Sequence, residues 1–258
     1  MVPSTGRMRK KLSDAEKAKR EAKRERRAAA SPAAPSPSGA TLGQLIGRDD
    51  LLRLVSKSTG ALIREAEAEV VRLGRAHSCA TCTAEKGCCK LSVTILFHEA
   101  LPIADRLRRD GRDTPELRAR LAESAELMES NSRNAYRALR RPCTFLDSDE
   151  RCTVYEQRPR ECGAAFVFTP PERCSDLEAT GVETLRMPEQ ELRGRLGKTE
   201  LTVEQSVRMV RLEGPYVGAL PRMVLLALEA WDRSDFAAYL AEHAPAAAAR
   251  LFAASKRA

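Results

Sequence analysis

The stretch Cys79-Ala-Thr-Cys82-Thr-Ala-Glu-Lys-Gly-Cys88-Cys89, which we call the first cysteine group, decides how this chain is organised. The short loop of a Cys-x2-Cys pair lets both thiolates reach one metal ion, so Cys79 and Cys82 are candidate ligands. The adjacent Cys88 and Cys89 need a sharp backbone turn to face one ion, because neighbouring side chains of an extended segment point to opposite sides. Otherwise these two thiols bind different metals.

A second cysteine group has the spacing Cys143-x8-Cys152-x9-Cys162. Cys174 would complete a count of eight, enough for two four-thiolate sites. His77 and His98 are close enough in sequence to replace a cysteine in a mixed site, whereas His243 is expected on the surface. The two cysteine groups together predict a metal-binding centre.

Structural disulfides are the main alternative, and they require an oxidising compartment. The basic amino terminus is followed by an Ala run and a Pro/Ser run, without the apolar region of a secretory signal. No segment approaches the roughly 20 apolar residues that span a bilayer. We therefore expect a cytoplasmic protein without a membrane anchor, whose reduced thiolates are available to bind metal.

The positive charge is concentrated at one end of the chain. Residues 1–40 contain 11 Lys or Arg and four acidic residues, so they carry +7 of the formal net charge of +8. Such a segment buries too little apolar surface to order itself, so we expect a disordered basic arm and a Pro/Ser linker. Nucleic acid is a possible partner of residues 1–40 through phosphate contacts, and a solvated extension is the simpler interpretation.

The rest of the chain is rich in Ala, Leu and Arg and predicts a mainly α-helical fold. One or two helices are expected within 41–74, with Gly60 as a possible interruption, and a strand at 91–97 precedes a helix from 98 to 109. Thr114-Pro115-Glu116 has the features of a helix start, and that helix should run to about residue 140. Pro142 stops it and would return the second cysteine group to the first. Further helices are expected at 187–196, 201–212, 221–231 and 234–253.

The element Cys152-Thr-Val-Tyr155-Glu-Gln-Arg158-Pro-Arg-Glu-Cys162 is the most specific motif in the chain. With the first cysteine group, it resembles the YkgJ-type CxxCxxCC family of zinc- or iron-chelating cysteine-cluster proteins, to which flagellin lysine N-methylases also belong. The resemblance covers about residues 79 to 166. Two features depart from the usual family pattern: the longer gap between Cys82 and Cys88, and Gly163 in place of a basic residue after the last cysteine.

The resemblance implies that zinc or an iron–sulfur cluster is held by the cysteines of both groups. The implied ligands are Cys79, Cys82, Cys88, Cys89, Cys143, Cys152 and Cys162. It also implies that Tyr155 and Arg158 lie beside the cluster and donate hydrogen bonds toward sulfur. A structural role is the alternative for this pair, with Tyr155 in the local core and Arg158 at a helix end.

The expected architecture is a set of helices packed around an irregular cysteine-rich, metal-binding centre. Its parts are a basic tail and linker (1–40), a helical segment (41–76), the cysteine-cluster region (77–175) and a carboxyl-terminal helical region (176–258). The expected function is metal binding with an unknown protein or small-molecule partner. The family relatives suggest S-adenosylmethionine-dependent lysine N-methylation as an alternative, but the chain lacks a Gly-rich strand-to-helix turn for such a cofactor.

Overall fold

The structure is a computed structural model of the 258-residue chain. It describes residues 39–46, 50–72, 87–163, 166–167, 184–185, 205, 207, 212 and 216–244. The chain divides into two units, Met1–Ser38 and Gly39–Ala258, and the described residues all belong to the second. The predicted disorder of the basic arm therefore falls outside the described residues, and so do the helix predicted at 187–196 and most of the one at 201–212.

Two helices, α2 (Leu42–Ile46) and α3 (Asp50–Arg72), begin the second unit. At the start of α2, the backbone N–H of Gln44 donates to the Thr41 hydroxyl, and the Gln44 side chain accepts from the Thr41 N–H in return. The predicted interruption at Gly60 is wrong, because α3 passes through this residue. Burial of Val55 and Ile63 on either side of Gly60 compensates for its poor helix propensity, which costs about 1 kcal/mol relative to Ala.

The predicted strand and the helix after it are confirmed as β1 (Thr94–Leu96) and α4 (Phe97–Arg109). β1 pairs antiparallel with β4 (Val217–Ala219), a strand that the sequence pattern did not reveal. Hydrogen bonds from Leu220 N to Val93 O and from Phe97 N to Tyr216 O extend the ladder at both ends, each at 2.8 Å. This pairing holds the start of α4 beside the start of the last helical region.

The long helix predicted from Thr114 is two helices, α5 (Pro115–Ser130) and α6 (Arg133–Ala138). Its start is confirmed, since the Thr114 hydroxyl accepts from Leu117 N at the amino end of α5. The predicted continuation is wrong because Asn131 is extended, its side chain donates to Leu127 O, and Ser132 caps a new helix by accepting from Ala135 N. Side chains that bond to nearby backbone compete with helix continuation at this point.

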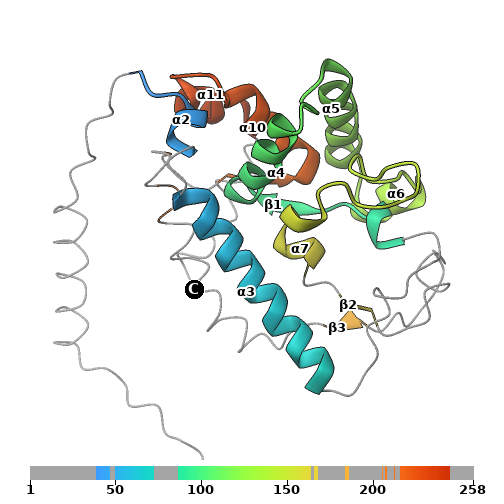
Figure 1. Ribbon diagram of the computed structural model, residues 1–258. Coiled ribbons are helices and arrows are strands. Elements are labelled where there is room, and N and C mark those ends of the chain that lie inside the picture. Colours follow the sequence, from blue (N-terminus) through green and yellow to red (C-terminus); the bar gives the residue numbers. More distant parts are fainter. Residues whose placement is uncertain are drawn as a thin grey trace, which may run out of the picture. The chain divides into compact units, whose positions relative to one another are not determined.

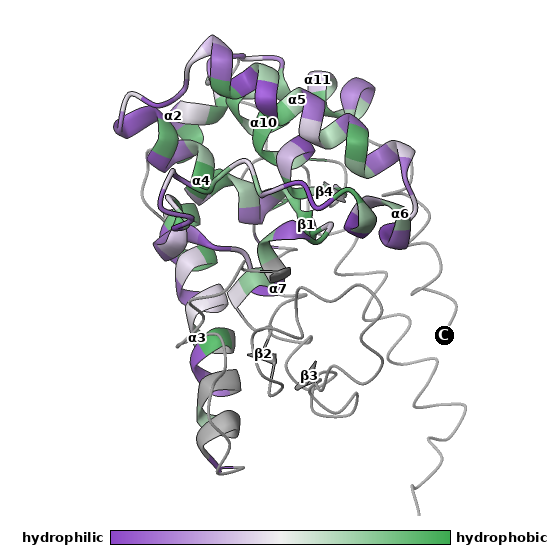
Figure 2. Ribbon diagram, turned by 90° about the vertical axis from the view of Figure 1, so that its right-hand side faces the viewer, coloured by the Kyte–Doolittle hydropathy of each residue, from purple (hydrophilic) through white to green (hydrophobic). Residues whose placement is uncertain are grey.

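Helix α10 (Leu220–Ala230) is the most buried element of the described fold, and it packs against α4 and α5 (Figure 1). Every residue of α10 except Arg222 and Glu229 is buried, and Figure 2 shows it as an almost continuously hydrophobic helix. Arg222 forms an ion pair with Glu129 of α5, and Glu229 accepts from the Tyr239 hydroxyl. The two polar side chains of α10 therefore bind neighbouring helices.

The last described helix, α11 (Phe236–His243), is shorter than the predicted 234–253. It ends because Ala244 has extended backbone, the conformation favoured by a residue that precedes a proline. Phe236 is buried, and Trp231 and Tyr239 pack against the core. His243 is exposed as expected and stacks on the Tyr239 ring.

The remaining described helices are short: the 3-10 helices η2 (Gly87–Lys90) and η3 (Tyr155–Gln157), and the one-turn helix α7 (Arg160–Gly163). The remaining described strands, β2 (Phe166–Val167) and β3 (Thr184–Leu185), form an antiparallel pair. The fold is thus mainly helical, as predicted. Among the described helices, none has the length and apolar character needed to cross a membrane.

Candidate metal centre

The Cys88-Cys89 doublet lies in the 3-10 helix η2. A 3-10 helix turns by about 120° per residue, so successive side chains leave the backbone in different directions but do not alternate as in a strand. The backbone therefore turns at the doublet, and whether both thiols bind one metal stays a prediction. The Cys89 side chain is half-buried, while that of Cys88 is outside the description.

A backbone hydrogen bond joins the two cysteine groups. The N–H of Cys143 donates to the carbonyl oxygen of Cys89 at 2.9 Å, across 54 positions of sequence. After α6 the backbone turns at Arg140, whose φ of 50° lies in the left-handed region, and Pro142 is two positions further along the chain. The prediction that a helix end returns the second group to the first is confirmed at Cys143.

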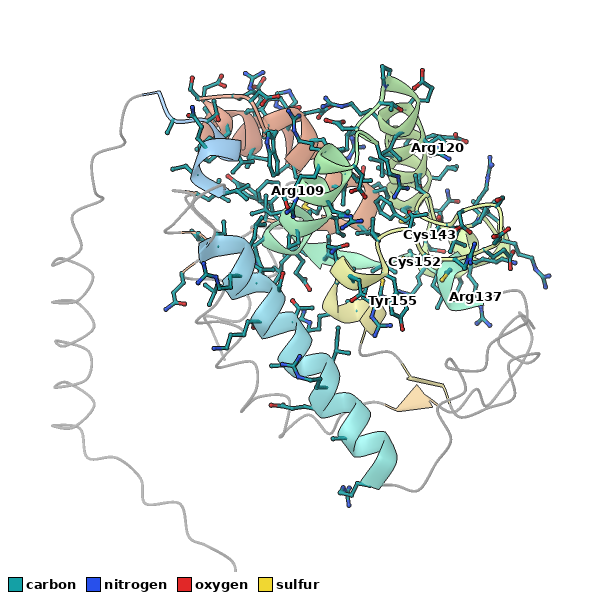
Figure 3. The ribbon with its side chains drawn as sticks, viewed as in Figure 1. Arg109, Arg120, Arg137, Cys143, Cys152 and Tyr155 are labelled. Atoms are coloured by element: carbon teal, nitrogen blue, oxygen red, sulfur yellow. The ribbon has the colours of Figure 1, made fainter. Side chains whose placement is uncertain are left out.

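Cys143 and Cys152 belong to one compact turn. Leu146 N donates to Cys143 O, Leu146 and Cys152 form an isolated antiparallel bridge, and Thr153 N donates to Phe145 O. Both cysteines are half-buried and pack against the hydrophobic core. Figure 3 labels both cysteines on the chain between α6 and α7.

The tip and the base of this turn are fixed by side chains. At the tip, the Asp147 carboxylate accepts from the N–H groups of Asp149 and Arg151. At the base, Arg112 from the loop before α5 donates to the Thr153 hydroxyl at 2.8 Å, and this hydroxyl donates to Phe145 O. The turn with Cys143 and Cys152 is therefore attached to the helical body through Arg112.

Cys162 lies in the one-turn helix α7, and its side chain is exposed. The N–H groups of Cys162 and Gly163 both donate to Pro159 O, and the N–H of Arg160 donates to the carboxylate of Glu99 at 2.9 Å. At the other end of α7, a Cβ on Gly163 would lie 2.2 Å from Cδ1 of Ile63 in α3. The absence of a side chain at Gly163 therefore allows α7 to pack closely on α3.

Tyr155 and Arg158 contact each other. The guanidinium carbon of Arg158 lies 4.1 Å from the centre of the Tyr155 ring, a cation–π geometry. Tyr155 is 54% exposed, so the alternative that placed it in the local core is wrong. Both residues lie between Cys152 and Cys162 in sequence; their hydrogen bonding toward sulfur remains a prediction.

Tyr136 of α6 is a neighbour of Cys143 that sequence reasoning missed. Its side chain is buried, and burial raises the pKa of its hydroxyl above the usual range; the negative charge of a Cys143 thiolate raises it further, whereas a hydrogen bond with Ser124 lowers it. The tyrosine keeps its proton and lies within the electrostatic field of Cys143. A lone Tyr in a predicted helix gave no signal of this proximity.

His98 and Glu99 are the buried polar or charged residues of the described fold. Burial, and then the positive charge of Arg160, lower the pKa of His98 to about 4, so this imidazole is neutral at pH 7. Glu99 accepts from Leu96 N at 3.1 Å as well as from Arg160 N. His98 was expected as a candidate metal ligand, whereas no local pattern marked Glu99, because its partner Arg160 is 61 positions away in sequence.

The structure thus describes four predicted ligands, Cys89, Cys143, Cys152 and Cys162, and joins the first two by a backbone hydrogen bond. Cys79, Cys82, Cys174 and His77 lie outside the described residues, as does the Cys88 side chain. Within the described ranges, no three His, Cys, Asp or Glu side chains form a group that could hold a metal ion. The donor set fits zinc or an iron–sulfur cluster, because thiolates are the ligands that both prefer.

Comparison with curated proteins and with solved structures gives no match. A family model does match residues 78–181, a segment that includes all eight cysteines and less than half of the chain. The description of that family is "CxxCxxCC: Putative zinc- or iron-chelating domain", and the match confirms the resemblance of the cysteine-bearing part of this chain to that family.

Proposed function

We propose that residues 77–175 bind zinc or an iron–sulfur cluster through cysteine thiolates drawn from both cysteine groups. The observation that carries the proposal is the hydrogen bond from Cys143 N to Cys89 O, which brings a member of each group together. Ligands from segments far apart in sequence make metal binding a cross-link, and its free energy then contributes to folding. Among the cysteines, the half-buried Cys89, Cys143 and Cys152 fit a centre that lies at the edge of the helical core.

The chemistry that the centre supports depends on its coordination. Four closed thiolate positions would hold structural zinc, while an open position would allow metal transfer or redox exchange. Thiolates are soft ligands that accept zinc and iron–sulfur clusters alike, and the metal content of the protein distinguishes the two.

The test is elemental analysis of the full chain purified without air, with zinc, iron and acid-labile sulfide measured per chain. We expect one of two results: zinc alone, or iron with matching sulfide.

Cys79→Ser and Cys152→Ser, one from each group, should each lower the metal content and the protease resistance of the protein together. Ser148→Ala, an exposed position in the turn between Cys143 and Cys152, is the matched control and should retain both. Wild-type protein without zinc or iron, or both cysteine variants with full metal content, would refute the proposal.

A further inference from the structure

We propose that Glu99 is a positioning residue for the metal centre, which holds the ligand Cys162 in place through the first N–H of α7. The inference rests on the proposed function, because it assigns a role toward a metal that Cys162 would bind. It concerns a residue outside the cysteine motif, on the helix α4 that belongs to the hydrophobic core.

The Glu99 carboxylate is almost completely buried, with 4% of the residue exposed. A buried carboxylate is strongly destabilising unless hydrogen bonds replace its lost water. Both oxygens have such a partner: Oε2 accepts from Leu96 N at 3.1 Å, and Oε1 accepts from Arg160 N at 2.9 Å. Because both donors are backbone groups, the carboxylate fixes the path of the chain at Arg160 relative to the start of α4.

Helix α7 needs this external contact. It has four residues, Arg160–Gly163, and a single turn makes too few hydrogen bonds of its own to be stable. Its internal bonds run from Cys162 and Gly163 to Pro159 O, which leaves the Arg160 N–H to be satisfied by another group. Glu99 supplies that group, and Ile63 packs on Gly163 at the opposite end.

Cys162 lies between these two contacts. Its side chain is exposed, so core packing does not determine where its thiol points. The position of α7 determines it, and Glu99 determines the amino end of α7. Groups that orient metal ligands in this way typically change metal affinity by about 10- to 100-fold when they are removed.

Two substitutions disrupt the hydrogen bond between Arg160 N and the Glu99 carboxylate, one at the acceptor and one at the donor. Glu99→Gln keeps the size of the side chain but presents an amide N–H₂ where one oxygen accepted a hydrogen bond. Arg160→Pro removes the donor, at a first helical position where proline is tolerated. Exposed Glu156→Gln is the matched control for the first variant. Arg160→Ala is the control for the second, because it keeps the N–H and loses only the side chain.

The probe is Co(II), added without air to reduced, metal-free full-length protein and followed by its thiolate-to-cobalt absorption. We expect Glu99→Gln and Arg160→Pro to weaken Co(II) binding about 10- to 100-fold and to lower the absorption per cobalt. Both controls should bind as wild type does. In a Cys162→Ser background, Glu99→Gln should have little further effect, because the ligand that it positions is already absent.

An equal loss of affinity from Glu99→Gln in the wild-type and Cys162→Ser backgrounds would overturn the inference, since Glu99 would then act on general stability. Wild-type affinity and absorption in both Glu99→Gln and Arg160→Pro would also overturn it and leave the proposed function intact. Wild-type protein that takes up no Co(II), and that contains no iron with acid-labile sulfide when purified without air, would refute the proposed metal site itself, and the role of Glu99 with it.

Discussion

Helix α10 and the segment 139–163 are held in place by different interactions. α10 buries nine of its 11 residues against α4, α5 and neighbouring elements. The segment 139–163 has Phe145, Val154, Pro159 and Gly163 as its buried residues, and it is shaped mainly by backbone hydrogen bonds between turns. Full burial of a large apolar side chain stabilises the fold by about 1.5–3 kcal/mol, so several buried side chains of α10 each contribute to holding it in place. The cysteine segment relies on a few polar contacts and, in our proposal, on a metal.

The difference teaches that this chain combines a helical body that folds by apolar burial with a cysteine segment attached to it at specific points. Those points are three hydrogen bonds: from Cys143 N to Cys89 O, from the Arg112 side chain to the Thr153 hydroxyl, and from Arg160 N to the Glu99 carboxylate. Substitutions in the body should therefore affect the whole unit, whereas substitutions at attachment points should affect the cysteine segment first.

The largest expected effect comes from the body itself. Leu101 of α4 is completely buried in the core, and Leu101→Ala should lower the free energy of unfolding by about 3 kcal/mol, through lost apolar burial and a residual cavity. Leu139→Ala is the control in the cysteine segment, because Leu139 is 46% exposed and its truncation should cost less than about 0.5 kcal/mol. Urea unfolding followed by circular dichroism measures both. Equal effects of the two substitutions would contradict the division into body and segment.

An intermediate effect is expected where the helical body meets the cysteine segment, because His98 of α4 lies near Arg160 of α7. Burial and the Arg160 charge lower the pKa of His98 from 6.5 to about 4, so the unfolded chain takes up a proton below pH 6.5 that the folded chain does not. Stability is therefore lost as the pH falls from about 6.5 to about 4. At pH 5 the loss should be about 2 kcal/mol relative to pH 7.5.

The measurement is urea unfolding of wild type and His98→Gln at pH 7.5 and pH 5.0. His98→Gln should lose about 2 kcal/mol less than wild type over this interval, because it lacks the titrating group. Protonation of other groups is common to both proteins and cancels in the comparison. Parallel losses in the two proteins would show that His98 does not contribute to the pH dependence.

The smallest effect is expected at Gly163, where α7 meets α3. An added Cβ would lie 2.2 Å from Cδ1 and 2.6 Å from Cγ1 of Ile63, so Gly163→Ala must displace this side chain. Overpacking of this kind costs about 1–3 kcal/mol, and the better helix propensity of Ala offsets up to about 1 kcal/mol of it. A net destabilisation of about 1 kcal/mol is expected from urea unfolding.

Ile63→Val sharpens this prediction, because it removes the Cδ1 atom that is closest to the added Cβ. Gly163→Ala should therefore cost less in the Ile63→Val protein than in wild type, as a double-mutant cycle would show. A cost that is the same in both backgrounds would mean that Ile63 is not the obstacle, and that the close packing of α7 on α3 does not explain the glycine.

Local sequence signals predicted the elements that local interactions determine. The start of α5 at Thr114-Pro115 follows from a side-chain cap and the fixed backbone angle of proline, which need no distant partner. The break at Asn131 and Ser132 was missed because helix propensity over 114–140 is high, and two short side-chain hydrogen bonds decide against it. β4 was missed because three residues, Val217–Ala219, carry no alternation and become a strand only by pairing with β1.

The sequence by itself determined the resemblance to a chelating domain, because the cysteine spacing pointed to the family whose model matches residues 78–181. It also determined the mainly helical class, through apolar periodicity and helix-capping residues. Only the tertiary structure decided that Cys89 lies against Cys143, that Glu99 binds the start of α7, and that Gly163 packs on Ile63. These contacts join residues that are 54 to 100 positions apart in sequence. A sequence pattern gives the chemistry of each residue, but which distant residue it contacts depends on burial and hydrogen bonding in the folded chain.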